Sequence, residues 1–196
     1  MTDPLFDGDD AANTPLSPEE REGLIPTYIA VRAELNEAEQ GNIAEGSEWA
    51  LRRRRDVLDE GFLRTLHQRM FGKVWKWAGQ YRTTARNIGV DAYRIPQEVA
   101  QLVGDAGYWV EHDTYPPDET AIRFSHRLVA IHPFPNGNGR FSRLAGDLLA
   151  LRLGRPRFTW GSANLAEPHE VRARYVAALR AADKHDIGPL LEFARS

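Results

Sequence analysis

Residues 131–143 read IHPFPNGNGRFSR, and this stretch decides how the chain around it folds. Its two prolines and two glycines prevent an ordinary helix and require a tight, irregular loop. The residues on either side have the apolar spacing of helices, which we place at 118–131 and 139–153. The side chain of Asn138 is suited to cap the second helix, and Gly154 is suited to end it. The stretch is therefore predicted to be a loop that joins two helices.

The same loop has the features of an anion-binding site. The first N–H groups of a helix have no partner within it, and the helix dipole adds partial positive charge there. Gly137 and Gly139 allow a ligand to approach the backbone, and Arg140 and Arg143 are expected on one side of the first turn. Together these groups would hold a polyphosphate. His132, at the other end of the loop, is a candidate base for a hydroxyl group.

Each of these residues has an ordinary structural explanation when it is taken singly. His132 could end a helix or lie in the core, and Arg143 could pair with Asp147 one turn later. A Gly-Asn-Gly segment alone is a turn. The combination of all of them within twelve residues, where a loop meets a helix, favours the functional interpretation.

Composition limits the class of protein. The chain has 196 residues, of which 42% are hydrophobic and 27% are charged, as in ordinary globular proteins. The absence of cysteine excludes disulfides, thiolate metal sites and a cysteine nucleophile. A net charge of -3 argues against a nucleic-acid partner. Residues 1–13 do not resemble a secretion signal and no apolar run approaches the ~20 residues that cross a bilayer, so we expect a cytoplasmic protein without a membrane partner.

Three parts are expected along the chain. Residues 1–16 are acidic, contain glycine and proline, and are predicted to be disordered. Residues 17–58 are predicted to form N-terminal helices, which begin at the capping box Ser17-Pro18-Glu19-Glu20. Residues 59–196 are predicted to form the catalytic domain.

Apolar spacing predicts helices through most of the chain, with Gly41 and Gly46 as breaks in the N-terminal part. The predicted helices cover residues 27–40, 49–58, 62–72, 97–111, 118–131, 139–153, 167–183 and 187–194. Residues 81–95 are rich in Thr, Val, Ile and Tyr around Gly89, which predicts a short β-hairpin. The predicted fold is an all-α domain with one hairpin attached.

A metal-dependent hydrolase or nuclease is a rival interpretation, because the chain has six histidines. They are His67, His112, His126, His132, His169 and His185. No pair has the His-Glu-x-x-His spacing of a helical zinc site, which argues against this class.

Residues 132–143 resemble the signature of the Fic family. The signature has a histidine, a proline and a phenylalanine, two variable positions, Gly-Asn-Gly-Arg, and a second arginine three residues later. The segment Trp77-Ala78-Gly79 resembles the family's Trp-Ala-Gly segment, which precedes a flap hairpin. The resemblance is close over about residues 62–153. The whole chain, including Leu35-Asn36-Glu37-Ala38-Glu39-Gln40, resembles the Fic subgroup called mobile mystery protein B.

The resemblance implies a Fic-type helical bundle with one β-hairpin flap and the activity of a protein adenylyltransferase. In this reaction a Tyr, Ser or Thr hydroxyl of a target protein attacks the α-phosphate of ATP, and pyrophosphate leaves. The implied roles follow the signature: His132 is the base, Asn136 holds Mg²⁺ or Mn²⁺, Gly137, Asn138 and Gly139 form the anion hole, and Arg140 and Arg143 bind the β- and γ-phosphates. The flap would bind the target by main-chain pairing, and its implied target-binding residues are Thr84, Arg86, Asn87, Ile88 and Gly89.

One position departs from the family's pattern. The family usually has Asp or Glu where this chain has Asn136, whose amide oxygen can bind Mg²⁺ but carries no charge. Weaker metal binding is therefore expected. The departure leaves a second interpretation open, in which the chain is a module that binds nucleotide or a partner protein without turnover.

The resemblance also implies control of the activity. Many Fic proteins carry an inhibitory helix whose glutamate pairs with the second arginine of the signature. Glu45, followed by Gly46, is the candidate here and would pair with Arg143, although Gly41 stands where the inhibitory motif has Ser or Thr. A solvated helical glutamate is an equally good interpretation of Glu45. An antitoxin or regulator encoded separately is a further partner that the resemblance allows.

Overall fold

The computed structural model describes residues 17–52, 55–162 and 168–196. Most of these residues lie in helices, and the described part of the chain contains no β-strand. An isolated antiparallel bridge joins Leu24 to Trp75. The predicted all-α class is confirmed.

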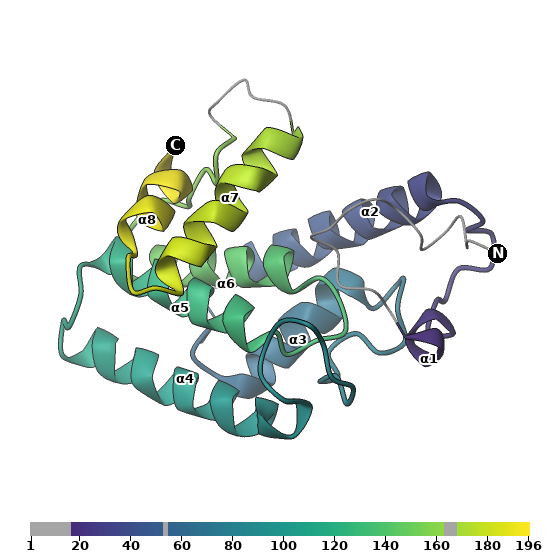
Figure 1. Ribbon diagram of the computed structural model, residues 1–196, viewed down its shortest axis with the longest axis horizontal. Coiled ribbons are helices and arrows are strands. Elements are labelled where there is room, and N and C mark those ends of the chain that lie inside the picture. Colours follow the sequence, from purple (N-terminus) through teal and green to yellow (C-terminus); the bar gives the residue numbers. More distant parts are fainter. Residues whose placement is uncertain (1–16, 53–54, 163–167) are drawn as a thin grey trace.

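The helices follow one another along the chain as labelled in Figure 1. They are α1 (Pro18–Arg21), α2 (Arg32–Leu51), α3 (Glu60–Phe71), the short 3-10 helix η1 (Ala92–Arg94), α4 (Ile95–Glu111), α5 (Pro117–Ile131), α6 (Asn138–Arg152), α7 (Pro168–Ala182) and α8 (Gly188–Arg195). The predicted disordered segment, residues 1–16, lies outside the described residues.

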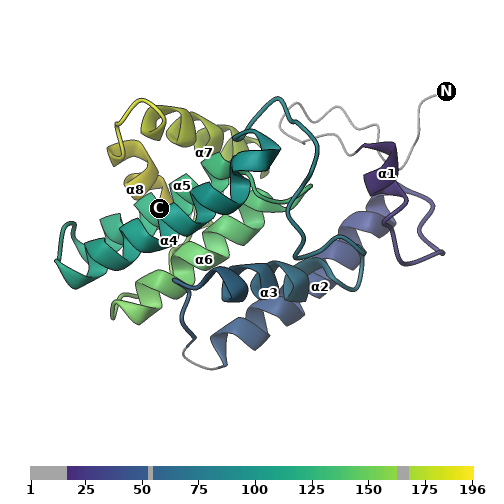
Figure 2. The ribbon, with the colours of Figure 1, turned by 90° about the horizontal axis from the view of Figure 1, so that it is seen from below.

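The helices form three groups. Helices α4, α5 and α6 pack together at the centre, α2 pairs with α3 on one side, and α7 pairs with α8 on the other (Figures 1 and 2). The two outer groups meet the centre through contacts of α3 with α6 and of α8 with α5. No helix of the described residues is both long enough and apolar enough to span a bilayer.

Small residues bring α5 and α6 together. A Cβ atom added at Gly146 would lie 2.9 Å from the Cβ of Ser125. The Ser125 hydroxyl donates a 2.9 Å hydrogen bond to the Ser142 carbonyl. This close packing fixes the two ends of the loop at residues 132–137, which joins the helices.

The N-terminal helices differ from the prediction. A single helix, α2, runs through Gly41 and Gly46, and it ends at Leu51 instead of continuing toward residue 58. Gly46 lies where α2 crosses α3, since an added Cβ would be 2.8 Å from the backbone of Arg69. This glycine therefore permits close helix packing and does not break the helix.

The predicted hairpin at residues 81–95 was also wrong. Its two arms bind not to each other but to the residues where α5 ends and the signature loop begins: the Arg82 N–H donates to the Pro133 carbonyl at 2.9 Å, and the Val90 N–H to the Ile131 carbonyl at 3.3 Å. The Arg82 side chain fills the space between the arms and donates to the carbonyls of Thr84 (2.9 Å) and Val90 (2.5 Å). The flap, defined here as residues 83–90, is thus an irregular loop, and the residues that follow it form η1 and α4.

Candidate active site

His132 lies where α5 ends and the signature loop begins. Its backbone adopts the left-handed conformation, with φ 56° and ψ 59°, which turns the chain sharply out of the helix. The side chain is buried, and the residue is only 7% exposed. The Arg82 guanidinium fixes this turn from the flap side, because its Nε donates a 2.7 Å hydrogen bond to the His132 carbonyl.

The surroundings of His132 keep its ring neutral. Burial lowers its pKa to about 4, and the positive charges of Arg82 and Arg86 act in the same direction. The Val129 carbonyl accepts a hydrogen bond from the ring. In a neutral imidazole one nitrogen donates and the other keeps a lone pair, which is the form of histidine that acts as a base.

Asn138 holds the loop in its shape. It is 2% exposed, and its side chain makes two hydrogen bonds to one residue. Its Oδ1 accepts from the Phe134 N–H at 2.9 Å, and its Nδ2 donates to the Phe134 carbonyl at 2.8 Å. We predicted Asn138 as the cap of α6, but the capping position belongs to Gly137 and Asn138 is the first helical residue. The Asn138 side chain therefore stabilises the loop, while the Asn138 backbone N–H belongs to the first turn of α6.

The two glycines of the signature have different surroundings. Gly137 has φ 79°, and an added Cβ would lie 2.5 Å from the ring of Phe71, so both conformation and space exclude a side chain. At Gly139 an added Cβ would meet no atom within 4 Å. The backbone at Gly139 therefore faces open space at the N-terminus of α6. A phosphate there could reach the N–H groups of the first turn, which have no preceding helical carbonyl to bind.

Asn136 is fixed at its backbone by a residue far away in the sequence. The carbonyl of Asn136 accepts a 3.1 Å hydrogen bond from Nε2 of His67, while Nδ1 of His67 accepts from the Gly79 N–H at 3.0 Å. The His67 ring is fully buried and stacks on Phe134 with 3.7 Å between centroids. Burial lowers the pKa of His67 to about 3, so the ring is neutral and has one donor and one acceptor for these two partners.

The side chain of Asn136 has one oxygen that could bind a metal ion. Its Oδ1 accepts from the Gly137 N–H at 2.5 Å and retains a second lone pair. Among the described residues no three His, Cys, Asp or Glu side chains gather in a metal-binding group. A single protein oxygen suits Mg²⁺ bound to nucleotide, since this ion takes its other ligands from phosphates and water. It does not suit the zinc hydrolase considered above.

The two signature arginines contact different neighbours. Arg140 Nη1 forms a 2.7 Å ion pair with Oε2 of Glu39 in α2, and its guanidinium lies 5.0 Å from the ring centroid of Phe71. Arg143 lies 5.2 Å from the ring centroid of Tyr175 in α7, and its Nε donates to the Gly139 carbonyl at 3.3 Å. We predicted both on one side of the first turn. Their long side chains instead reach toward α2 and α7.

The predicted pairing of Glu45 with Arg143 is not formed. Glu45 pairs with Lys73, and its side chain is 58% exposed. The acid that reaches a signature arginine is Glu39, which lies nearly two turns earlier on α2 and is 7% exposed as a residue. Glu39 also accepts a 2.8 Å hydrogen bond from Trp75 Nε1, so its carboxylate is held by two partners.

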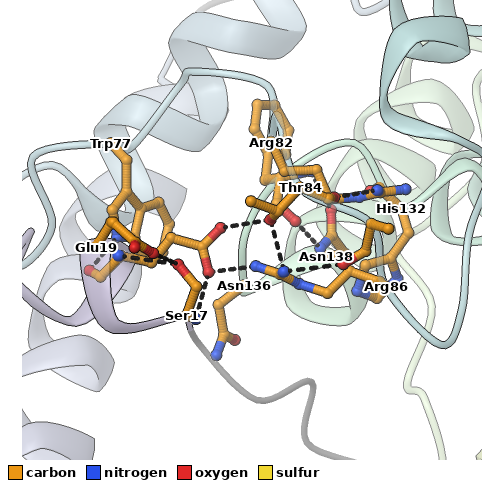
Figure 3. Close-up of polar contacts among 12 residues, drawn as sticks. Ser17, Glu19, Trp77, Arg82, Thr84, Arg86, His132, Asn136 and Asn138 are labelled. Carbon is orange, nitrogen blue, oxygen red and sulfur yellow. Dashed lines mark hydrogen bonds and ion pairs between the residues drawn. The ribbon is translucent and has the colours of Figure 1, made fainter.

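The flap lies against the histidine. Gly89 has φ 89°, and an added Cβ would be 2.6 Å from the Cβ of His132. Thr84 and Arg86 lie near one another and near Arg82 on the side of the flap that faces α1, as Figure 3 shows. Ile88 is 46% exposed, and Asn87 is also exposed. Of the five predicted flap residues, Gly89 thus lies against the histidine, Thr84 and Arg86 face α1, and Asn87 and Ile88 are at the surface.

Several residues of the site have no clear signal in the sequence. Four such residues lie on four different segments. His67 binds the backbone of Asn136, and Arg82 binds the His132 carbonyl and the flap. Glu39 pairs with Arg140, and Tyr175 contacts Arg143. Arg82 directly follows the Trp77-Ala78-Gly79-Gln80-Tyr81 segment, which is the one hint available. The other three occupy ordinary helical positions.

The fold and the loop together define a class of protein: a helical domain in which a glycine-containing loop and the helix N-terminus that follows it lie beside a buried neutral histidine. A family model described as the Fic/DOC family matches residues 57–150, which include α3 through most of α6. Residues 57–150 are therefore a Fic/DOC domain. The comparisons do not extend to the mobile mystery protein B subgroup, which stays a prediction.

Curated relatives are similar to about two thirds of the chain. The protein adenylyltransferase fic-1 of Caenorhabditis elegans is 32% identical over 132 residues, which are 65% of this chain and 25% of that protein. The protein adenylyltransferase Fic of Drosophila melanogaster is 33% identical over 132 residues, with the same coverage of both chains. The chain therefore spans about a quarter of the length of these relatives.

Solved structures share the fold. BepC of Bartonella tribocorum, solved with bound AMPPNP, superposes with a TM-score of 0.69 and 18% identity, covering 91% of this chain and 97% of that one. A fragment of Fic-1 from Caenorhabditis elegans gives a TM-score of 0.64 and 24% identity, covering 89% of this chain and 51% of that one. At these identities the likeness establishes the fold.

Proposed function

We propose that this protein is a protein adenylyltransferase, which transfers AMP from ATP to a Tyr, Ser or Thr hydroxyl of a target protein. The observation that carries the proposal is the position of a buried neutral histidine beside a helix N-terminus that faces open space at Gly139. The curated relatives named above are protein adenylyltransferases, and the Fic/DOC family model matches the region that contains this loop. The AMPPNP bound to BepC supports a nucleotide as the ligand of the loop.

The residues present divide the reaction between them. The His132 ring nitrogen that carries the lone pair takes the proton of the target hydroxyl as the hydroxyl oxygen forms a bond to the α-phosphorus of ATP. The bond from that phosphorus to the bridging oxygen breaks, and pyrophosphate leaves with the electron pair. The first-turn N–H groups of α6 and the side chains of Arg140 and Arg143 stabilise negative charge on the phosphates. Mg²⁺ on Asn136, when bound, would neutralise further phosphate charge.

The direct test uses ATP labelled on its α-phosphate. We expect label on a Tyr, Ser or Thr side chain of a target or of the protein itself, and loss of that label in His132→Ala. Mass spectrometry should show the added mass of AMP. Nucleotide binding without transfer, in both Mg²⁺ and Mn²⁺, would instead support the second interpretation, a binding module with a degenerate site.

We propose further that Glu39 restrains the enzyme. Its carboxylate is paired with Arg140, which the reaction needs for phosphate oxygens, so a nucleotide must compete with an internal anion. Glu39→Gln keeps the acceptor for Trp75 but removes the charge, and we expect tighter ATP binding and faster transfer. Glu45→Gln is the matched control on the same helix, and it should leave both unchanged. Equal transfer rates in the Glu39→Gln variant and the wild type would contradict the proposal that Glu39 restrains the enzyme.

A further inference from the structure

Arg86 of the flap is bound by an acid from the N-terminal helix. Its Nη2 forms an ion pair with Oε2 of Glu20 in α1, and the two side chains are 7% and 12% exposed. Its Nη1 donates a 2.7 Å hydrogen bond to the hydroxyl of Thr84, which in turn donates to Oε1 of Glu20 at 3.3 Å. Thr84 and Arg86 therefore form, with Glu20, a buried anion-binding cluster beside the catalytic histidine (Figure 3).

Glu20 does not bind every donor of the Arg86 guanidinium. The Nε of Arg86 is buried and has no hydrogen-bond partner in the structure. Guanidinium groups bind a carboxylate most strongly side-on, with Nε and one terminal nitrogen each donating to one oxygen. Glu20 engages the terminal nitrogen and not Nε. A carboxylate that approached Arg86 side-on would satisfy both donors.

Glu20 belongs to a short element with few anchors. Helix α1 has four residues and contains no buried residue. It is held by the 3.0 Å hydrogen bond from Trp77 Nε1 to the Glu20 carbonyl, and by the backbone bonds of residues 23–25 to residues 74–76. The Glu20 carboxylate is also the acceptor of the capping box at the Ser17 N–H, at 2.8 Å. The acid can leave Arg86 without loss of the packed core.

We propose that Arg86 is the binding site for a carboxylate of the target protein and that Glu20 occupies this site in the resting molecule. A buried guanidinium needs an anion, so whatever displaces Glu20 must supply one. The flap lies between α1 and His132, the position from which an incoming hydroxyl would approach the base. Targets are therefore expected to carry Asp or Glu close to the modified hydroxyl. This inference rests on the proposed function, because it names a feature of that enzyme's protein substrate.

A target carboxylate is favoured over a nucleotide phosphate. The phosphates are expected at the N-terminus of α6, where Gly139 faces open space and where Arg140 and Arg143 lie. Arg86 instead lies on the flap and is bound through Thr84 to α1. Its charge also adds to that of Arg82 near the histidine ring, so an acidic segment of a target would be attracted to this side.

The test measures binding of peptides in the absence of ATP. The probes are short fluorescent peptides with one tyrosine and an Asp placed in turn at each neighbouring position, each matched by a peptide with Asn instead. Fluorescence anisotropy is measured on the full chain as wild type, Glu20→Gln and Glu20→Gln/Arg86→Gln. We expect Asp peptides to bind Glu20→Gln about tenfold more tightly than wild type, the equivalent of one charge-assisted hydrogen bond. The double variant should lose this gain, and Asn peptides should not show it.

A charge reversal and a matched control complete the experiment. Glu20→Gln/Arg86→Glu should prefer peptides with Lys over those with Asp, and Glu22→Gln, a nearby exposed change, should behave as wild type. Equal binding of Asp and Asn peptides to Glu20→Gln, or no binding of either, overturns the proposal. A gain in ATP affinity without a gain for Asp peptides assigns the site to phosphate and overturns it as well.

The two proposals fail separately in this design. AMP transfer with no preference for acidic peptides would refute the role of Arg86 and leave the adenylyltransferase standing. A preference for Asp peptides with no AMP transfer would keep Arg86 as a carboxylate-binding site and refute the enzyme.

Discussion

The protonation state of His132 follows from its burial, and it determines how the reaction should depend on pH. Burial, and then the charges of Arg82 and Arg86, lower the pKa of His132 to about 4, below the ordinary value of about 6.5. A histidine that accepts a proton acts in its neutral form, so the rate rises with pH through the pKa and is level above it.

We therefore expect kcat/KM for AMP transfer to rise near pH 4 and to be level from about pH 6 to about pH 8. The measurement is initial rate against pH with saturating Mg²⁺ and subsaturating target. An acid limb near pH 6.5 would show that the ring is hydrated and ionises normally, contrary to its position in the structure.

Asn136 and Asn138 stand two residues apart and should respond in opposite ways to a change to Asp. Asn136→Asp adds a negative charge at the side chain that we propose to hold Mg²⁺, so the Mg²⁺ concentration for half-maximal nucleotide binding should fall about tenfold. Asn138→Asp removes the Nδ2 donor to the Phe134 carbonyl and leaves a buried acceptor unsatisfied, which should cost about 1–3 kcal/mol of stability. Calorimetric titration and thermal unfolding separate the two effects. An unchanged Mg²⁺ requirement in Asn136→Asp would exclude Asn136 as the metal ligand.

Helix α2 contains two glycines, Gly41 and Gly46, and their different surroundings explain why the helix is not broken at either. A Cβ at Gly46 would lie 2.8 Å from the backbone of Arg69 in α3, whereas a Cβ at Gly41 would meet no atom within 4 Å. Gly46→Ala should therefore destabilise the protein by about 1–3 kcal/mol through overpacking. Gly41→Ala should stabilise it by about 0.5–1 kcal/mol, since Ala has the better helix propensity. Urea unfolding of both variants gives the comparison, and equal signs would contradict the packing of α2 on α3.

The same glycines show what periodicity alone can predict about an element. The helices from α3 to α8 were predicted within a few residues because their apolar faces and end signals are local. The break at Gly46 was wrong because its cause is the backbone of α3, a contact across the fold. The hairpin was wrong for a related reason. Its strand-like composition is real, but the Arg82 side chain and the carbonyls of Ile131 and Pro133 take up the hydrogen bonds that strand pairing would use.

At the scale of the whole molecule, the site is assembled from segments that are distant in the sequence. The signature loop could be predicted because its histidine, glycines and arginines lie within twelve residues. Its supports could not, since His67 comes from α3, Glu39 from α2 and Tyr175 from α7. Glu45 was the candidate from the sequence because a glycine follows it, and Glu39 was not identified, since the direction in which α2 presents each acid depends on how the helix packs on α3.

Two buried neutral histidines make the stability of the whole fold depend on pH. The pKa is lowered to about 3 in His67 and to about 4 in His132, in both cases first by burial. Below about pH 6.5 the unfolded chain binds a proton at each ring that the folded chain does not bind. Stability is therefore full above about pH 6.5 and decreases as pH falls toward the folded pKa values, by about 2 kcal/mol per histidine at pH 5.

This dependence should weaken when one of the two rings is removed. The slope of the unfolding free energy against pH is measured by urea unfolding between about pH 5 and about pH 6.5. In His132→Ala this slope should fall by up to the amount that one bound proton contributes. The substitution also changes packing, but packing shifts the free energy at every pH and leaves the slope alone. His112→Ala, which removes an exposed histidine, is the control and should not produce the same loss of slope. If His132→Ala keeps the slope of the wild type, then His132 is protonated in the folded protein or is not buried, and a neutral base at this position is excluded.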